Sequence, residues 1–172
     1  IKWKIGAKWA GVAAGFAALM FMVQTQDPRS WGREGPESAD YFEPSLARTT
    51  SGDFIDAEVL DNDEYCLQCH EDAYQSWSHS AHRFSSFNNG PYAKSLQDTR
   101  AFLSARDGNT QASRFCAGCH DPVPFLSGAF DDPRWDDPDY PVSEDPLGQA
   151  AITCTVCHAI SHVNSNLGNA AY

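Results

Sequence analysis

Cys66-Leu67-Gln68-Cys69-His70 (CLQCH) is the first of three copies of one pattern, C-x-x-C-H. The other copies are CAGCH at 116–120 and CTVCH at 154–158. This pattern is typical of haem c attachment, in which two thiols bond to the porphyrin vinyl groups and the next histidine binds the iron. All six cysteines of the chain lie in these copies. The sequence therefore predicts three covalently attached haem c groups.

The three copies define the first candidate site residues. One copy alone would also fit half of a zinc knuckle or a dithiol redox pair. A structural zinc site needs four converging ligands, whereas here each copy ends in its own histidine, which favours haem. The predicted attachment residues are Cys66, Cys69, Cys116, Cys119, Cys154 and Cys157, and the predicted proximal iron ligands are His70, His120 and His158.

Three further histidines, His79, His82 and His162, lie outside the motifs and are candidates for the remaining axial positions. The only methionines, at 20 and 22, lie in the apolar N-terminal segment, so methionine is not expected as a ligand. Two ligands of one iron must approach from opposite faces, whereas residues four apart on a helix share a face. If that segment is helical, His162 therefore serves a different haem from His158, and the same reasoning separates His79 from His82. Without His79 as a ligand, one iron keeps an open position.

Composition bounds the fold class. The chain has 172 residues, mean hydropathy is −0.46, and runs of Val, Ile and Leu are few, so a β-sandwich is not expected. We expect a mostly α fold with extensive irregular chain, in which haem supplies much of the interior.

The formal net charge is −11, and residues 1–26 carry three lysines and no acid, so the excess of acid lies in 27–172. Nucleic acid is therefore not an expected partner.

The sequence divides the chain into three predicted segments. Basic residues 1–8 precede an uncharged stretch at 9–26, which favours a membrane anchor helix over residues 1–26 with the rest of the chain on the periplasmic side of a bacterial inner membrane. A cleavable signal peptide is the alternative. Residues 27–64 predict an extended linker or strap, with Trp31, Tyr41-Phe42 and Phe54-Ile55 as docking points. Residues 65–172 predict the trihaem domain.

Local signals give a few elements within that domain. Residues 71–82 predict a helix that runs from the first motif, and 95–106 predict a helix that ends at Asp107-Gly108. The acidic, proline-rich stretch at 130–141 predicts irregular, solvated chain; it lacks the spacing of an EF-hand calcium loop. Residues 168–172 give no structural signal.

The first motif is followed by Trp77, Ser80 and His82. This arrangement resembles the multihaem cytochromes c related to hydroxylamine oxidoreductase and to its tetrahaem electron acceptor. The resemblance implies that His82 is a distal haem ligand. No motif here ends in lysine, as resemblance to the pentahaem nitrite reductases would require, so nitrite reduction of that type is not expected.

These features predict a membrane-anchored trihaem cytochrome c that passes electrons between a membrane-bound respiratory or photosynthetic complex and periplasmic redox carriers. The N-terminal helix would contact the membrane complex, and other redox partners would be soluble or membrane proteins. One alternative is a haem enzyme with one open iron that acts on a small nitrogen or oxygen species. Another is a wire-forming structural subunit whose haems stack between copies. The number of axial ligands distinguishes electron transfer from the enzyme.

Overall fold

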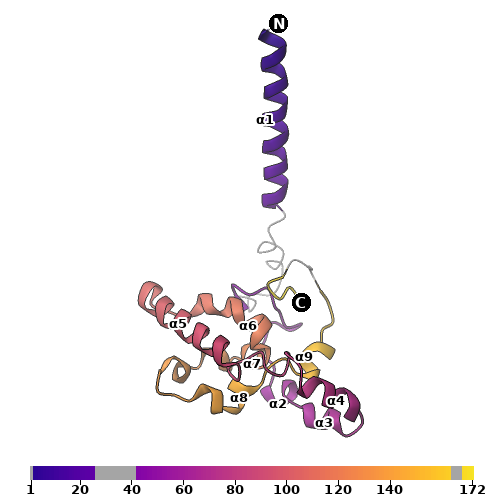
Figure 1. Ribbon diagram of the computed structural model, residues 1–172, viewed down its shortest axis with the longest axis vertical. Helices are drawn as coiled ribbons and strands as arrows, with labels where there is room; N and C mark the ends of the chain where they lie inside the picture. Colours follow the sequence, from indigo (N-terminus) through magenta and orange to yellow (C-terminus); the bar gives the residue numbers. More distant parts are fainter. Residues whose placement is uncertain (1, 26–41, 164–167) are drawn as a thin grey trace. The chain divides into compact units, whose positions relative to one another are not determined.

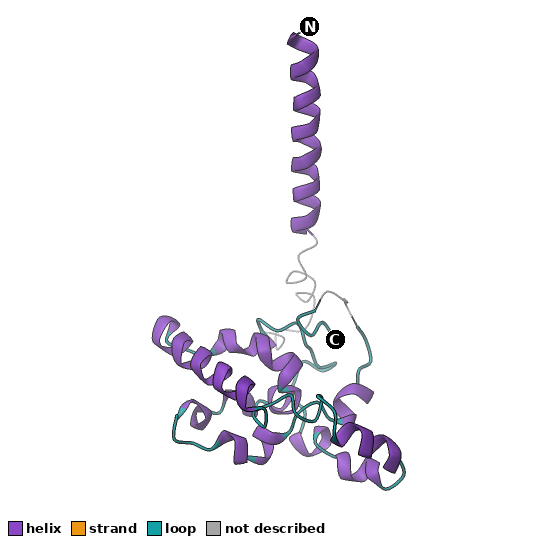
Figure 2. Ribbon diagram, in the orientation of Figure 1, coloured by secondary structure: helices purple, strands orange, loops and turns teal. Residues whose placement is uncertain are grey.

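The computed structural model describes residues 2–25, 42–163 and 168–172 (Figure 1). The chain divides into two units, Ile1–Glu34 and Gly35–Tyr172. In the described ranges the secondary structure is helical, with turns and irregular chain and no strand (Figure 2). The mostly α character therefore agrees with the composition. Of the aromatic docking points expected in the linker, Trp31 and Tyr41 lie outside the described residues.

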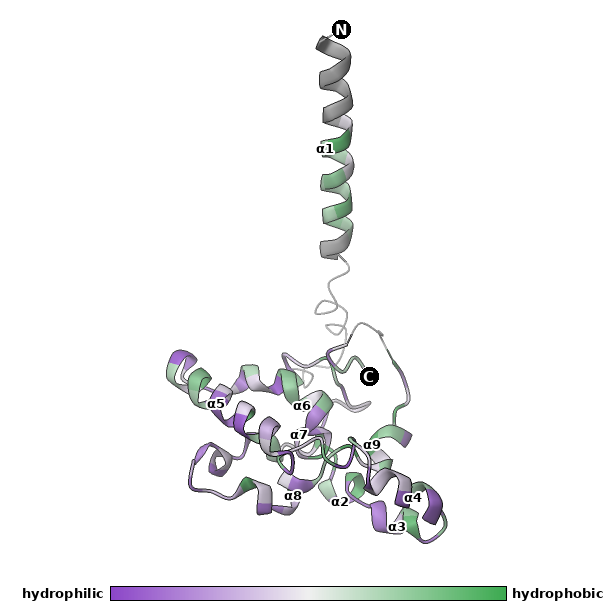
Figure 3. Cartoon of the chain, viewed as in Figure 1, coloured by the Kyte–Doolittle hydropathy of each residue, from purple (hydrophilic) through white to green (hydrophobic). Residues whose placement is uncertain are grey.

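The first unit contains helix α1 (Lys2–Thr25). Among the helices that the structure describes, none is long and apolar enough to cross a membrane. The predicted transmembrane anchor, and with it the single-pass location in the inner membrane, is therefore wrong. Residues 11–22 of α1 include two glycines and four alanines, which contribute little apolar surface. Figure 3 shows this as pale segments between the green ones.

The second unit is built from short helices. Only α5 (Gly90–Asp107) is long among those described in this unit. The other α-helices are α2 (Ala57–Leu60), α3 (Asp63–Leu67), α4 (Glu71–Ser78), α6 (Arg114–His120), α7 (Pro122–Ser127), α8 (Pro146–Gln149) and α9 (Cys154–His158). Single 3-10 turns are η3 (Gln111–Ser113), η4 (Ala129–Asp131), η5 (Pro133–Asp136) and η6 (Val142–Glu144). Such short elements depend on tertiary packing for their stability.

Helix α5 begins earlier than the sequence analysis predicts. The Asn89 side chain accepts a hydrogen bond from the backbone N–H of Tyr92, and Pro91 lies in the first turn, so both are favourable N-terminal residues. The helix ends as predicted, because Gly108 adopts the left-handed conformation (φ 73°). Helix α4 is shorter than predicted: it ends at Ser78, and turns follow it.

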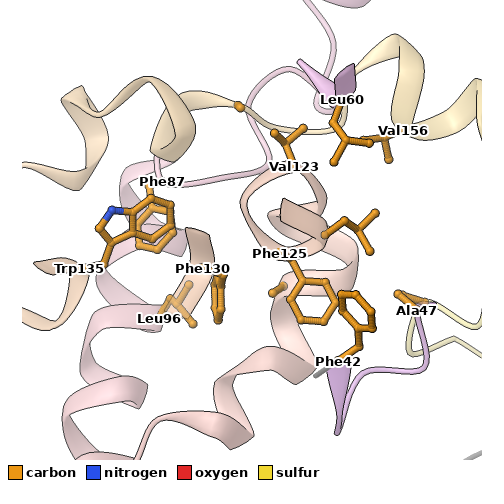
Figure 4. Close-up of a cluster of buried hydrophobic side chains, with 14 of the residues drawn as sticks. Phe42, Ala47, Leu60, Phe87, Leu96, Val123, Phe125, Phe130, Trp135 and Val156 are labelled. Carbon is orange, nitrogen blue, oxygen red and sulfur yellow. The ribbon is translucent and has the colours of Figure 1, made fainter. Parts of the chain in front are cut away.

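The unit has an apolar core of protein side chains (Figure 4). Phe125 of α7 packs edge to face against Phe42 and Phe130, with ring centroids 5.4 and 6.1 Å apart. Trp135 contacts Phe87 in the same manner at 5.1 Å. Trp135 and Phe130 are buried although they belong to the acidic stretch that was expected to be solvated. In that stretch, η4 and η5 turn the two aromatic rings into the core and leave most of the carboxylates outside.

Arg100 is a buried charge within α5, 1% exposed. Its Nε donates to the Asp136 carboxylate at 2.7 Å, its Nη1 donates to the carbonyl oxygen of Phe130 at 3.0 Å, and its guanidinium lies 4.9 Å from the Phe130 ring centroid. These contacts attach η4 and η5 to α5.

Arg100→Met is expected to lower the free energy of unfolding by about 2 kcal/mol, because charge-assisted hydrogen bonds are lost and the Phe130 carbonyl loses its donor. Urea unfolding followed by circular dichroism measures this change. The control is Arg106→Met on the same helix, whose exposed pair with Asp107 should leave stability essentially unchanged. Equal effects of the two substitutions on the free energy of unfolding would contradict the stabilising role of the buried Arg100 contacts.

Candidate functional site

Each C-x-x-C-H motif lies on or between short helices of the second unit. The first spans the end of α3 and the start of α4, where His70 is the residue before the helix. The second fills the end of α6, and its last residue is His120. The third is α9 itself. Residues three apart on a helix are neighbours, so in α6 and α9 the two thiols lie one turn apart on one side.

Hydrogen bonds hold the start of the third motif beside the residues that precede the first motif. Thr153 caps α9 by accepting from the N–H of Val156 at 3.2 Å, and its hydroxyl donates to the Leu60 carbonyl at 2.6 Å. The Cys154 N–H donates to the Asp63 carboxylate at 2.7 Å. Burial, then the Asp63 carboxylate and the nearby Cys66 thiol, raise the pKa of Cys154 to about 12. Helix α3, which carries Asp63 and Cys66 of the first motif, therefore lies beside the start of the third motif.

The His120 ring is held in a defined orientation. Its Nδ1 lies 2.9 Å from the carbonyl oxygen of Ser85, whose hydroxyl donates to the His120 carbonyl at 2.9 Å. The Tyr92 ring stacks on the imidazole, with centroids 4.2 Å apart and planes 12° apart. When Nδ1 carries the proton and donates to Ser85, Nε2 keeps its lone pair for a metal. This is the geometry that a proximal iron ligand needs.

A buried carboxyl, that of Asp121, directly follows His120 in the sequence. Asp121 is fully buried and bonds to the hydroxyls of Ser86 and Tyr92; the Ser86 hydroxyl also lies 3.1 Å from the Gly148 carbonyl oxygen. Burial raises the pKa of Asp121 from 3.8 to about 7, although the bonds from Ser86 and Tyr92 and the Arg100 charge act in the opposite direction. Burial and the Asp121 charge likewise raise the pKa of Tyr92. We call the hydrogen-bonded residues Asp121, Ser86, Tyr92 and Gly148 the Asp121 network.

The predicted distal ligands lie close to the motifs in sequence. His79 follows α4, and its Nδ1 lies 2.9 Å from the Gln75 carbonyl oxygen, so Nε2 is the nitrogen available to a metal. The His82 carbonyl accepts from the N–H of Ile152 at 3.2 Å, and the Trp77 indole donates to the Ile152 carbonyl at 2.8 Å. The chain at 77–82 therefore lies beside the residues that lead into the third motif.

His162 lies beyond the end of α9, in non-helical chain. The rule that residues four apart share a helix face therefore does not constrain His158 and His162. His162 lines a cavity of about 190 Å³ together with Val156 of the third motif, Ile160 and Tyr172.

The surroundings of the motifs fit haem. Large apolar side chains next to them are exposed: Tyr65 is 68%, Phe115 is 55% and Ile160 is 39% exposed. A cavity of about 350 Å³ opens over the second motif, and its lining is mostly apolar: Tyr92, Leu96, Phe115, Cys116, Cys119 and His120 contribute to it. An apolar macrocycle bound at each motif would cover such surface.

The sequence analysis did not identify several residues that position the motifs. The Tyr172 hydroxyl donates to the Gly118 carbonyl in the second motif at 2.6 Å, and Ser45 packs against the same glycine. Tyr92, which stacks on His120, and Asp121, which bonds to Tyr92, also went unrecognised. Only Asp121 carried a local signal, since it directly follows a predicted ligand and precedes proline.

Three complete motifs with these surroundings define a c-type cytochrome. A family model described as cytochrome c554 and c-prime matches residues 65–159, which is more than half of the chain and includes all three motifs. The chain therefore belongs to this family of multihaem c-type cytochromes, which carry covalently bound haem c and transfer electrons. No curated protein and no solved structure matches the chain. The narrower resemblance to hydroxylamine oxidoreductase relatives stays a prediction.

Proposed function

We propose that this protein is a trihaem cytochrome that passes single electrons between partner redox proteins. The observation that carries the proposal is the presence of three complete attachment motifs in one unit, in which Cys154 bonds to Asp63 beside the first motif and Tyr172 bonds to Gly118 of the second. Electron hopping requires such closely spaced redox centres. The haem irons supply the one-electron chemistry, while the chain holds and tunes them.

In this proposal each motif provides two thioether anchors and one axial histidine. The anchors are Cys66, Cys69, Cys116, Cys119, Cys154 and Cys157; the proximal ligands are His70, His120 and His158; the distal ligands are His79, His82 and His162. Support for His79 and His120 comes from their Nδ1 atoms, which each lie 2.9 Å from a backbone carbonyl oxygen and so leave Nε2 for iron. Six histidines then fill six axial positions.

The net charge indicates the kind of partner. At −11 the chain favours encounter with a protein that presents a basic surface, because complementary charge accelerates association. Association should therefore slow as ionic strength rises.

The test is a haem count. Intact mass and haem absorbance of the purified protein should both give three haems per chain, and replacing both Cys154 and Cys157 by serine should lower the count to two. Cys66→Ser together with Cys69→Ser is the matched control for a different motif and should also remove one haem. Fewer than three haems in the wild-type protein would refute the trihaem proposal.

Ligation is tested separately. Electron paramagnetic resonance of the oxidised protein should show essentially all ferric iron as low-spin. A high-spin fraction of about one iron in three would show incomplete axial ligation. That result would overturn the proposal that all six histidines are ligands.

A further inference from the structure

Two segments far apart in sequence lie side by side next to the second motif. The Leu46 N–H donates to the Asn169 carbonyl at 3.0 Å, and the Arg48 N–H donates to the Tyr172 carbonyl at 2.9 Å. The Asn169 amide donates to the Pro44 carbonyl at 3.1 Å. We call residues 44–48 and 168–172 together the clasp.

The clasp packs tightly on the second motif. A Cβ atom built on Gly118 would lie 2.4 Å from Ser45 Oγ and 2.8 Å from Ala170 Cβ, so the backbone of the motif touches both clasp segments. Ser45 is fully buried and Ala170 is 8% exposed. The clasp therefore fixes the position of the C-A-G-C-H backbone without contributing a predicted haem ligand.

One clasp residue also reaches the third motif. The Tyr172 hydroxyl donates to the Gly118 carbonyl at 2.6 Å, while Tyr172 lines the 190 Å³ cavity together with Val156, Ala159 and His162. Burial raises the pKa of Tyr172, and the nearby thiols of Cys119 and Cys157 raise it further. Those two cysteines are the second attachment residues of the second and third motifs, so the phenol lies near both.

We propose that Tyr172 is a positioning residue that fixes the second and third haem attachment motifs relative to each other and thereby sets electron transfer between them. This inference rests on the proposed trihaem function. The hydrogen bond to Gly118 anchors the phenol to one motif. Its ring packs against the apolar core that includes Val156 of the other motif, and it borders the same cavity as that residue. Tyr172 binds no metal in this proposal; it acts through the spacing of the two motifs.

The experiment compares Tyr172→Phe, Tyr172→Ala and the control Tyr140→Phe in the haem-loaded protein. Tyr140 is also partly buried, and its hydroxyl also donates one hydrogen bond, to Asp145 at 2.7 Å. The readouts are the haem count by mass, the reduction potentials by spectroelectrochemistry, and electron transfer between haems after pulse radiolysis. Measuring the haem count first separates the two proposals, since fewer than three haems in the wild-type protein would refute the proposed function whatever Tyr172 does.

We expect Tyr172→Ala to keep three haems, to shift the potentials of two of them, and to slow transfer between haems by about tenfold, because small misplacements of reacting groups are costly in rate. Tyr172→Phe keeps the ring and should give a smaller change of the same sign, whereas Tyr140→Phe should match the wild-type protein. If Tyr172→Ala loses a haem, Tyr172→Phe decides the question. Wild-type potentials and rates in a Tyr172 variant that holds three haems would overturn the proposal.

Discussion

Asp121→Asn is expected to remove most of the pH dependence of stability between about pH 4 and pH 7. The pKa of Asp121 is about 7 in the folded protein and near 3.8 when the chain is unfolded. Across this window the folded state keeps a proton that the unfolded state releases, so stability falls as pH rises. The loss from this group is complete above pH 7 and amounts to about 4 kcal/mol.

Asparagine suits this position because the network fits a neutral group. The Ser86 hydroxyl has one hydrogen but contacts both Asp121 and the Gly148 carbonyl. A protonated Asp121 can donate to Ser86, which then donates to Gly148, while the Tyr92 hydroxyl donates to the other Asp121 oxygen. An asparagine amide can make the same donor and acceptor contacts. Asp121→Asn should therefore equal the wild-type stability near pH 4 and exceed it at pH 8.

Urea unfolding at several pH values, followed by far-ultraviolet circular dichroism, measures this difference. Asp98→Asn is the control, because Asp98 is exposed and pairs with Lys94 on the surface of α5. That control should keep the wild-type slope of stability against pH. An Asp121→Asn protein with the wild-type slope would show that the buried carboxyl is already ionised in the folded protein at low pH.

Local signals predicted the parts of the site that local chemistry determines. The C-x-x-C-H spacing predicts the attachment residues, and Asp107-Gly108 correctly predicted the end of α5. Local capping signals at Asn89-Gly90-Pro91 also indicate the start of α5, but the sequence analysis did not use them. The prediction from the uncharged N-terminal stretch was wrong. The lack of charge favoured a membrane helix, although the glycines and alanines of the stretch contribute little apolar surface.

Long-range contacts were not accessible from the sequence. Residues 168–172 have no periodicity, and their position follows from pairing with residues 44–48 more than a hundred positions earlier. Trp135 lies among carboxylates in the sequence, yet the turns around it and the Arg100 contacts bury it. Burial raises the pKa of Asp121, and the residues of its network come from separate parts of the sequence, Ser86 and Tyr92 from one and Gly148 from another. Sequence spacing does not report such convergence.

Gly148→Ala is expected to lower the free energy of unfolding by about 3 kcal/mol, because the new methyl group would overpack a site that cannot yield. A Cβ atom on Gly148 would lie 2.0 Å from the Val142 carbonyl oxygen and 3.0 Å from its carbon. The contact is with backbone, and the same carbonyl accepts from the Asp145 N–H at 3.1 Å, which fixes the turn between η6 and α8.

The direction of the change in stability distinguishes overpacking at Gly148 from the usual effect of glycine-to-alanine substitution. Glycine to alanine in a helix ordinarily stabilises a protein, because alanine has the higher helix propensity and restricts the unfolded chain. Gly90→Ala at the start of α5 is the control: a Cβ atom there has no neighbour within 4 Å, so stability should stay equal or rise slightly. Because the Gly148 carbonyl accepts from Ser86, its displacement should also disturb the Asp121 network and lower the benefit of Asp121→Asn in a double variant. Additive effects of the two substitutions in urea unfolding would contradict this coupling.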